Sequence, residues 1–370
     1  MKKILFAAAL AAMTLTACCD GGKTAVVMGD SSEFDSLSYA LGANIATGMS
    51  YQLSEVPFDY KAIDREFQKA ALNKTSVSHD DARKVLQDYF SYQKFAQRKQ
   101  EIARKRAEAD SIRQANGEEP EKVYAADPDM FESEEEREEV SSAFGTDLGY
   151  NVRESGLPLQ VVWMLEGMQN VRDKNAKMSE DEIGRYLQHY FMVTRPAENA
   201  EASKAWLEKI EKKSGVKKTE SGLLYKVIKA GDKNLMPSDP RDVVKVHYTG
   251  RLRTGKVFDT SLFKNRPKEQ QEMMKLQLPD SYDKDEPVEF PLNRVIKGWT
   301  EGMQLVGKGG KIKLWIPSEL AYGSSDNGRI GPNEALEFEV ELIDVTPYEA
   351  PAPVEAEPEA QGENAWAPAE

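Results

Sequence analysis

The sequence predicts an α+β protein, in which an all-helical N-terminal region of two repeated units precedes a small antiparallel β-sheet domain. Apolar residues recur at helical spacing as far as about residue 210. Parts of this helical region are repeated about one hundred residues further along. Beyond Thr219 the pattern changes to the alternation of half-buried strands. The 370 residues are enough for more than one domain.

Composition narrows the classes of function. With 49 Lys and Arg against 62 Asp and Glu, the net charge is −13, so the surface repels phosphate backbones and nucleic acid is not expected as a partner. The chain has three His and two Cys, too few for a Cys/His zinc cluster or a disulfide framework. The sequence therefore predicts neither a metal site nor a cofactor. These residues are His79, His189, His247, Cys18 and Cys19.

The N-terminus predicts a secretory leader over 1–18. Two lysines precede the apolar run 4–13, which is too short for a permanent membrane span. The Leu-Thr-Ala-Cys sequence resembles the bacterial lipobox, so we expect lipidation of Cys18 and a tether over 19–33. An ordinary leader cleaved near Ala17 is the alternative. A lipid anchor fits a Gram-negative outer membrane facing the periplasm, and the cell surface stays open.

The first helical unit is predicted over 34–115. Ser78 followed by acidic residues is typical of a helix N-cap, and 91–115 is charged and helix-prone. Residues 116–139 are predicted to be a solvated acidic linker, because eleven Asp and Glu fall within 118–139. The periodic apolar residues are Leu37, Leu41 and Ile45 in one segment and Phe58, Ile63 and Phe67 in the next.

A duplication predicts the second helical unit and its linking helix over 140–218. Residues 38–45 align with 141–148, and 78–90 align with 179–191 with six of thirteen positions identical. The two matches come in the same order at offsets of 103 and 101 residues. Similarity between unrelated amphipathic helices is the alternative reading.

The third domain is predicted over 219–346, with strands at 243–248, 311–316 and 336–342. The Pro-, Ala- and Glu-rich residues 347–370 are predicted to be disordered. No motif for a nucleophile and base is present. Aromatic and aliphatic residues gather in the segments between strands instead, which indicates an apolar pocket for an apolar ligand. These residues are Phe258, Trp299, Tyr322 and Ile330.

Five sequence blocks identify the third domain. Over 219–346 they resemble, in order and register, an FKBP-type peptidyl-prolyl cis-trans isomerase. The resemblance implies an antiparallel sheet wrapped around a short helix. The two helical units resemble the N-terminal region of bacterial lipoproteins of the Mip and FkpA kind, present here twice. The blocks are HYTG (247–250), GKVFDTS (255–261), VIKGW (295–299), IPSELAYG (316–323) and FEVELIDV (338–345).

The resemblance also implies the site residues. Trp299 would form the floor on which the proline ring rests, the Ile296 N–H and the Tyr322 hydroxyl would orient the peptide, and Asp259 would be the pocket carboxylate. The alternatives are a core Trp299, a surface Tyr322 and an ordinary turn acid at Asp259. The catalytic set is Tyr248, Phe258, Asp259, Ile296, Trp299, Tyr322 and Phe338, and the substrate-binding set is Val288, Phe290, Val295 and Ile330.

The chemistry expected of such a site is rotation about an X–Pro bond. The barrier of about 18–20 kcal/mol arises from amide resonance. The twisted bond is less dipolar than the planar one, so a water-poor apolar site favours it. The resemblance implies an enzyme, without a covalent intermediate, that assists the folding of exported envelope proteins with X–Pro bonds. The alternatives are a non-catalytic holdase or scaffold and a docking factor for one envelope protein.

The sequence departs from the family pattern. Residues 262–286 exceed the usual span by about twenty and could be a lid, a client-contact surface or a surface excursion, which we favour because surface loops tolerate insertion. Val288 stands where many members of the family have an aromatic residue. Gly331-Pro332 replaces a Pro-Pro pair that is common in the family. Two helical units in one chain could pair with each other, so we favour a monomer over a homodimer. The alternative is that both units face outward and build a larger assembly or a cradle for unfolded chains.

Overall fold

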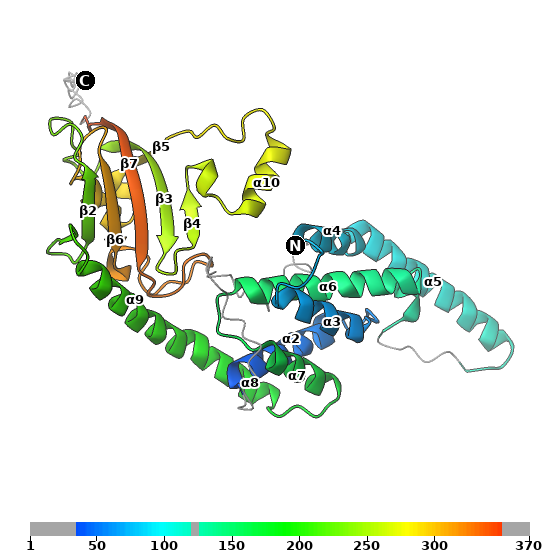
Figure 1. The fold of residues 1–370 in the computed structure, drawn as a ribbon. Coiled ribbons are helices and arrows are strands. Elements are labelled where there is room, and N and C mark those ends of the chain that lie inside the picture. Colours follow the sequence, from blue (N-terminus) through cyan, green and yellow to red (C-terminus); the bar gives the residue numbers. More distant parts are fainter. Residues whose placement is uncertain (1–34, 120–125, 350–370) are drawn as a thin grey trace, which may run out of the picture.

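The computed structural model describes residues 35–119 and 126–349. A helical part and a β-sheet part are joined by one long helix, α9 (Arg195–Glu211) (Figure 1). The predicted α+β class with this order of parts is confirmed. The predicted leader, Cys18 and tether lie outside the described residues, as does most of the predicted C-terminal tail. Within the described ranges, no helix combines the length and apolar character that a membrane crossing requires.

The two halves of the helical part begin their helices with the same kind of cap. Ser78 accepts a hydrogen bond from the Asp81 N–H, and Ser179 forms a capping box with Glu182. The predicted helix starts at these two serines are confirmed. The helices are α2 (Ser36–Gln52), α3 (Tyr60–Ala71), α4 (His79–Tyr89) and α5 (Tyr92–Ala115) in the first half, and α6 (Glu134–Glu154), α7 (Val161–Arg172) and α8 (Glu180–His189) in the second.

Helix α6 begins inside the stretch 116–139, which we expected to be a linker. Ser133 caps it through the Glu136 N–H, and three glutamates occupy its first turn. Negative charge at a helix N-terminus is favoured by the helix dipole, so the acidic run starts a helix here. A short 3₁₀ turn, η1 (Pro128–Met130), precedes it.

Helices of one half pack mainly on helices of the other half, α2 against α7 and α3 against α6. Equivalent hydrogen bonds occur at both of these helix contacts. The Asp59 N–H donates to the Ser141 hydroxyl at 2.9 Å, and the Gln160 N–H donates to the Ser38 hydroxyl at 2.8 Å. In the sequence repeat, Ser38 corresponds to Ser141 and Asp59 to Gln160. The halves therefore exchange helices to form one shared core.

Two equivalent glycines set the distance between the crossing helices. A Cβ on Gly42 would overlap the carbonyl oxygen of Met164, and a Cβ on Gly145 would overlap that of Ile63. Gly42 corresponds to Gly145 and Ile63 to Met164 in the repeat. Only glycine permits so close an approach at either crossing.

The connection to the sheet is almost continuous helix. Helix α8 passes through a π-helical turn, η2 (Tyr190–Thr194), into α9. We expected Pro196 to interrupt the helical pattern. Pro196 instead lies in the first turn of α9, directly after the π-helical turn, and the helix continues through it.

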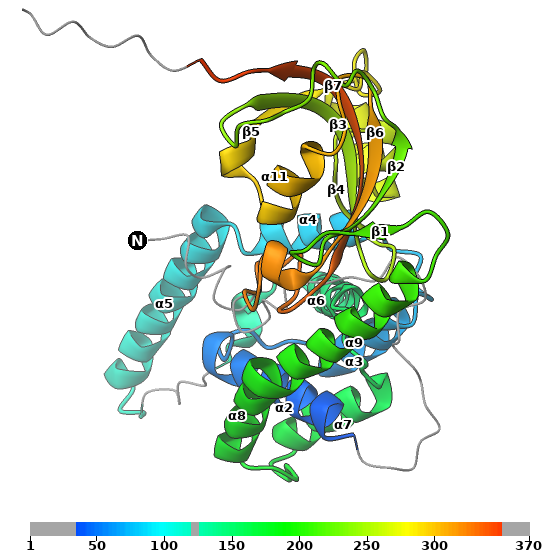
Figure 2. The ribbon, with the colours of Figure 1, turned by 90° about the vertical axis from the view of Figure 1, so that its left-hand side faces the viewer.

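The sheet has seven antiparallel strands in the order β1-β2-β6-β7-β3-β4, with β5 also paired to β3. Figure 2 shows the sheet curving around the short helix α11 (Lys297–Met303). Gly298 and Gly302 let α11 lie directly on Ile316 and Leu314 of β6. The strands are β1 (Lys217–Lys218), β2 (Leu224–Lys229), β3 (Val243–Leu252), β4 (Val257–Thr260), β5 (Val288–Pro291), β6 (Lys311–Ile316) and β7 (Leu336–Thr346).

The long insertion between β4 and β5 folds into a 3₁₀ turn, η3 (Phe263–Asn265), and a helix, α10 (Lys268–Gln277). Asn265 attaches its start to β3 through a hydrogen bond to the Thr249 hydroxyl at 2.8 Å. Three apolar side chains of the insertion stay exposed, Met273, Leu276 and Leu278. This helix was not predicted from the sequence.

Candidate functional site

Trp299 stands at the centre of a cluster of perpendicular aromatic rings. The centroid of its ring lies 5.3 Å from the ring centroid of Tyr248, 5.9 Å from that of Phe290 and 5.3 Å from that of Phe338. The interplanar angles are 87°, 83° and 88°. Phe258 packs on Phe338 in the same way at 5.6 Å. Edge-to-face contacts of this kind stabilise a fixed arrangement of rings. The structure therefore brings together five aromatic residues predicted for the site.

Four strands and one helix supply these rings. Strand β3 carries Tyr248, β4 carries Phe258, β5 carries Phe290 and β7 carries Phe338. Trp299 enters from α11, whose N-cap is Ile296 with φ −61° and ψ 149°. The Trp299 N–H donates to the Ile296 carbonyl at 2.9 Å, which closes the first turn.

Gly250 is a site residue that the sequence reasoning missed. It lies opposite Phe338 in the β3–β7 register. A Cβ there would come within 2.7 Å of the Phe338 ring and 2.8 Å of the Phe258 ring. Glycine is therefore required for these two rings to meet above β3. The predicted strand ended at residue 248, whereas β3 continues to Leu252, so Gly250 was not recognised as a strand glycine, which often marks such a close approach.

Two tyrosine hydroxyls and one carboxylate are the polar side-chain groups predicted for the site. The Tyr248 hydroxyl donates to a carboxylate oxygen of Asp259 at 2.7 Å. Burial and this hydrogen bond raise the pKa of Tyr248. Burial and the charge of Asp259 also raise the pKa of Tyr322. Both hydroxyls therefore keep their protons at neutral pH and can donate hydrogen bonds.

The predicted residues differ in their exposure. Trp299 is 4% exposed, while Tyr322 is 41% exposed. Ile330 is buried in the same core cluster as Trp299. The predicted residues that pack on this cluster while remaining partly exposed are Phe258, Val288, Phe290, Val295 and Ile296. These partly exposed apolar side chains thus surround a covered indole.

Helix α9 holds the loop that carries Ile330, which we call the 324–335 loop. The Asn199 side chain donates to the Pro332 carbonyl at 3.0 Å, and the Ser203 hydroxyl donates to the Asn333 carbonyl at 2.8 Å.

At the start of α9, Arg195 pairs with Asp326 at 3.0 Å. These contacts were not predicted, because Asn199 and Ser203 look like ordinary polar positions of a surface helix. The loop next to the aromatic cluster is thus tied to the helical part.

Comparisons with known proteins agree with this arrangement. The family described as FKBP-type peptidyl-prolyl cis-trans isomerase matches residues 236–343. The family described as the domain amino terminal to FKBP-type peptidyl-prolyl isomerase matches twice, over 34–125 and 137–227. The duplication of the helical unit is therefore confirmed.

Several relatives carry the same description. An FKBP-type peptidyl-prolyl cis-trans isomerase, FkpA of Escherichia coli K12, is 37% identical over 240 residues, covering 60% of this chain and 80% of that protein. A probable FKBP-type isomerase of Haemophilus influenzae is 47% identical over 133 residues, covering 36% of this chain and 46% of that protein.

A solved structure described as FkpA from Escherichia coli is 37% identical and covers 52% of this chain and 84% of that chain, with a TM-score of 0.36. The shared sequence over most of the FkpA chain, together with the matched isomerase domain, settles the family. The chain belongs to the FKBP-type peptidyl-prolyl cis-trans isomerases.

Proposed function

We propose that this isomerase acts through the aromatic cluster around Trp299, with the indole beneath the proline ring of the substrate. The observation that carries the proposal is the set of three perpendicular ring contacts that fix Trp299 beside partly exposed apolar side chains. An apolar, water-poor site lowers the barrier to rotation, because the twisted X–Pro bond is less dipolar than the planar bond.

The polar groups have separate roles in this proposal. The Tyr322 hydroxyl is protonated at neutral pH, and it donates to a carbonyl of the bound peptide. The Ile296 N–H at the start of α11 offers a second donor. Tyr248 directs its own hydroxyl to Asp259, which fixes the carboxylate at the edge of the site.

Isomerisation of a Phe-Pro tetrapeptide tests these assignments. We expect Trp299→Leu and Tyr322→Phe each to lower kcat/KM. The matched controls are Trp163→Leu and Tyr348→Phe. Trp163 lies in α7 of the helical part and is not a member of the core cluster around Trp299. Full activity in both site variants would refute the assignment and favour a domain that only binds.

The proposed substrates are unfolded or partly folded exported proteins with X–Pro bonds. The predicted leader over 1–18 supports export, and Cys18 would anchor the protein to the outer membrane facing the periplasm. Metabolic labelling with a radioactive fatty acid tests this, with Cys18→Ala as the unlabelled control. Protease treatment of intact cells distinguishes the periplasm from the surface, since only a surface protein would be cleaved.

The proposed oligomeric state is a monomer, in which the two helical halves of one chain pack on each other. The paired hydrogen bonds of Ser38 and Ser141 and the paired crossings of Gly42 and Gly145 support it, because each half already has its partner in the same chain. Sedimentation equilibrium should give the mass of one chain. A stable homodimer that forms through the helical part would contradict the proposal.

A further inference from the structure

Tyr39 has a much smaller residue at the equivalent position of the repeat. The repeat pairs Tyr39 of α2 with Ser142 of α6. Tyr39 is completely buried, and its hydroxyl accepts hydrogen bonds from the Lys177 N–H at 2.6 Å and the Asn170 side chain at 3.4 Å. Its backbone carbonyl lies directly on Gly167. The tyrosine thus has three defined neighbours in the half that holds it.

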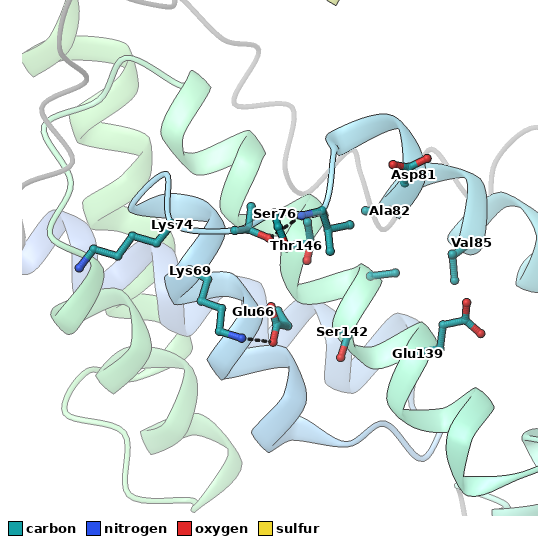
Figure 3. A pocket seen from close by; sticks show the side chains of 13 residues that line it. Glu66, Lys69, Lys74, Ser76, Asp81, Ala82, Val85, Glu139, Ser142 and Thr146 are labelled. Atoms are coloured by element: carbon teal, nitrogen blue, oxygen red, sulfur yellow. Dashed lines mark hydrogen bonds and ion pairs between the residues drawn. The ribbon is translucent and has the colours of Figure 1, made fainter.

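The equivalents of these neighbours lie in the first half and line a cavity there. Lys177, Asn170 and Gly167 correspond to Ser76, Lys69 and Glu66 at the repeat offset of 101 residues. All three line a cavity of about 590 Å³, together with Ser142. Figure 3 shows these side chains arriving from α3, α6 and the segment before α4. The cavity therefore corresponds to the place that Tyr39 fills beside α7 and the segment before α8.

At two further positions, the side chains that line the cavity are smaller than their equivalents in the repeat. Ala82 and Val85 of α4 line it, and their equivalents in α8 are the larger Ile183 and Tyr186. Ala82, Ala143 and Thr146 are buried, which gives the cavity a largely apolar floor.

The rim of the cavity is polar. The Lys69 ammonium pairs with the Glu66 carboxylate at 2.8 Å, and Lys74, Asp81 and Glu139 also reach the edge. The combination of an apolar floor with polar groups at the edge suits an amphipathic ring. Its volume exceeds that of one phenol ring, which leaves room for the backbone that carries the ring.

We propose that this cavity binds a tyrosine side chain of an unfolded client polypeptide. The ring would lie on Ala82 and Ala143, and its hydroxyl would meet the Ser76 N–H, as Tyr39 meets the Lys177 N–H in the other half. The proposal rests on the proposed folding function, because it assigns a client side chain to the helical part.

Binding to the full chain tests the proposal. The probe is a nine-residue proline-free peptide with a single tyrosine, and its tyrosine-to-alanine version is the control, both measured by NMR titration. We expect the tyrosine peptide to bind about tenfold more tightly, which corresponds to about 1.4 kcal/mol. Chemical shift changes should fall on the residues of the cavity.

Two variants separate the cavity from the rest of the surface. Ser142→Tyr should fill the cavity, abolish the preference for tyrosine and raise Tm. Ser142→Ala keeps the cavity and should retain the preference. Should Ser142→Tyr fail to fold, Ala82→Ile fills the floor with the residue found at the equivalent position 183.

The outcomes are decisive in both directions. Equal binding of the two peptides overturns the proposal, and so does a tyrosine preference that survives in a folded, filled variant. Binding of free p-cresol without binding of the peptide also overturns it, since the site would then take small phenols only. Isomerisation of the Phe-Pro tetrapeptide should be unchanged in every variant, so a failure here is distinguishable from a failure of the proposed catalytic site.

Discussion

Gly250 controls how closely two aromatic rings approach above strand β3. Any side chain there would press on Phe258 and Phe338, whose contact supports the ring cluster around Trp299. We expect Gly250→Ala to lower kcat/KM about tenfold or more, since a displacement near 1 Å in a site can cost up to ~100-fold. Tetrapeptide isomerisation measures the effect. Unchanged kcat/KM in a folded variant would show that ring spacing at this position does not matter.

Asp147 links stability to pH. Burial alone would raise the pKa of Asp147, but the hydrogen bonds and charges of His79 at 2.8 Å and Arg83 at 3.2 Å outweigh burial and lower it. Because the folded pKa lies below the unfolded value of about 3.9, this contribution is complete above that pH and disappears as the pH falls through the folded pKa.

Because the folded pKa of Asp147 is lowered, its ionised carboxylate should stabilise the fold at neutral pH. Asp147→Asn should lower the free energy of unfolding at neutral pH by about 1–3 kcal/mol. The difference from the unsubstituted protein should shrink below about pH 4. Urea unfolding across this range measures it. Asp88→Asn is the control, because Asp88 pairs with Lys94 at an exposed site and should change little. A cost that is independent of pH would contradict the assignment.

At the scale of the elements, the helix crossings depend on glycine. Gly42→Ala and Gly145→Ala should each destabilise the helical part by about 1–3 kcal/mol, because the helices must separate. Gly184→Ala is the matched control in the same helical part. Gly184 lies inside α8 with open space around it, so this change should stabilise by about 0.5–1 kcal/mol. Urea unfolding distinguishes the three, and equal effects would contradict the packing argument.

The elements also show what the sequence can predict. Ser78 and Ser179 indicated helix starts because their caps are local, and the alternating residues of β6 gave its bounds directly. The helix start at Glu134 was hidden by a run of charge that is also typical of loops. Helix α10 was missed because its sequence has no apolar face buried in a core to set its period.

The site was also predictable only where the signal is local in the sequence. The aromatic residues of the site were named from short sequence blocks, and the structure brings five of them together. Gly250 and the Ser203 contact could be found only once the strands and α9 had been placed, since both depend on neighbours far along the chain. Whether these residues carry catalysis stays a prediction until the variants are measured.

At the scale of the whole molecule, α9 is part of the isomerase unit as well as a connector. A fragment 219–346 lacks the Asn199 and Ser203 contacts to the 324–335 loop, whereas a fragment 195–349 keeps them. We expect the longer fragment to match the full chain on a tetrapeptide and the shorter one to have a lower kcat/KM. Ser203→Ala in the full chain should lower it in the same direction. Equal rates for both fragments would show that the loop needs no support.

Helix α5 occupies in the first half the place that α9 occupies in the second, because each follows the matching Tyr-Phe pair of the repeat. The two leave the helical part on opposite sides (Figure 1). Of these two helices, only α9 leads into an isomerase domain. The chain therefore has one isomerase domain for two helical units. A client bound to the helical part, as proposed above, would meet one isomerase domain, so its X–Pro bonds would be isomerised one at a time.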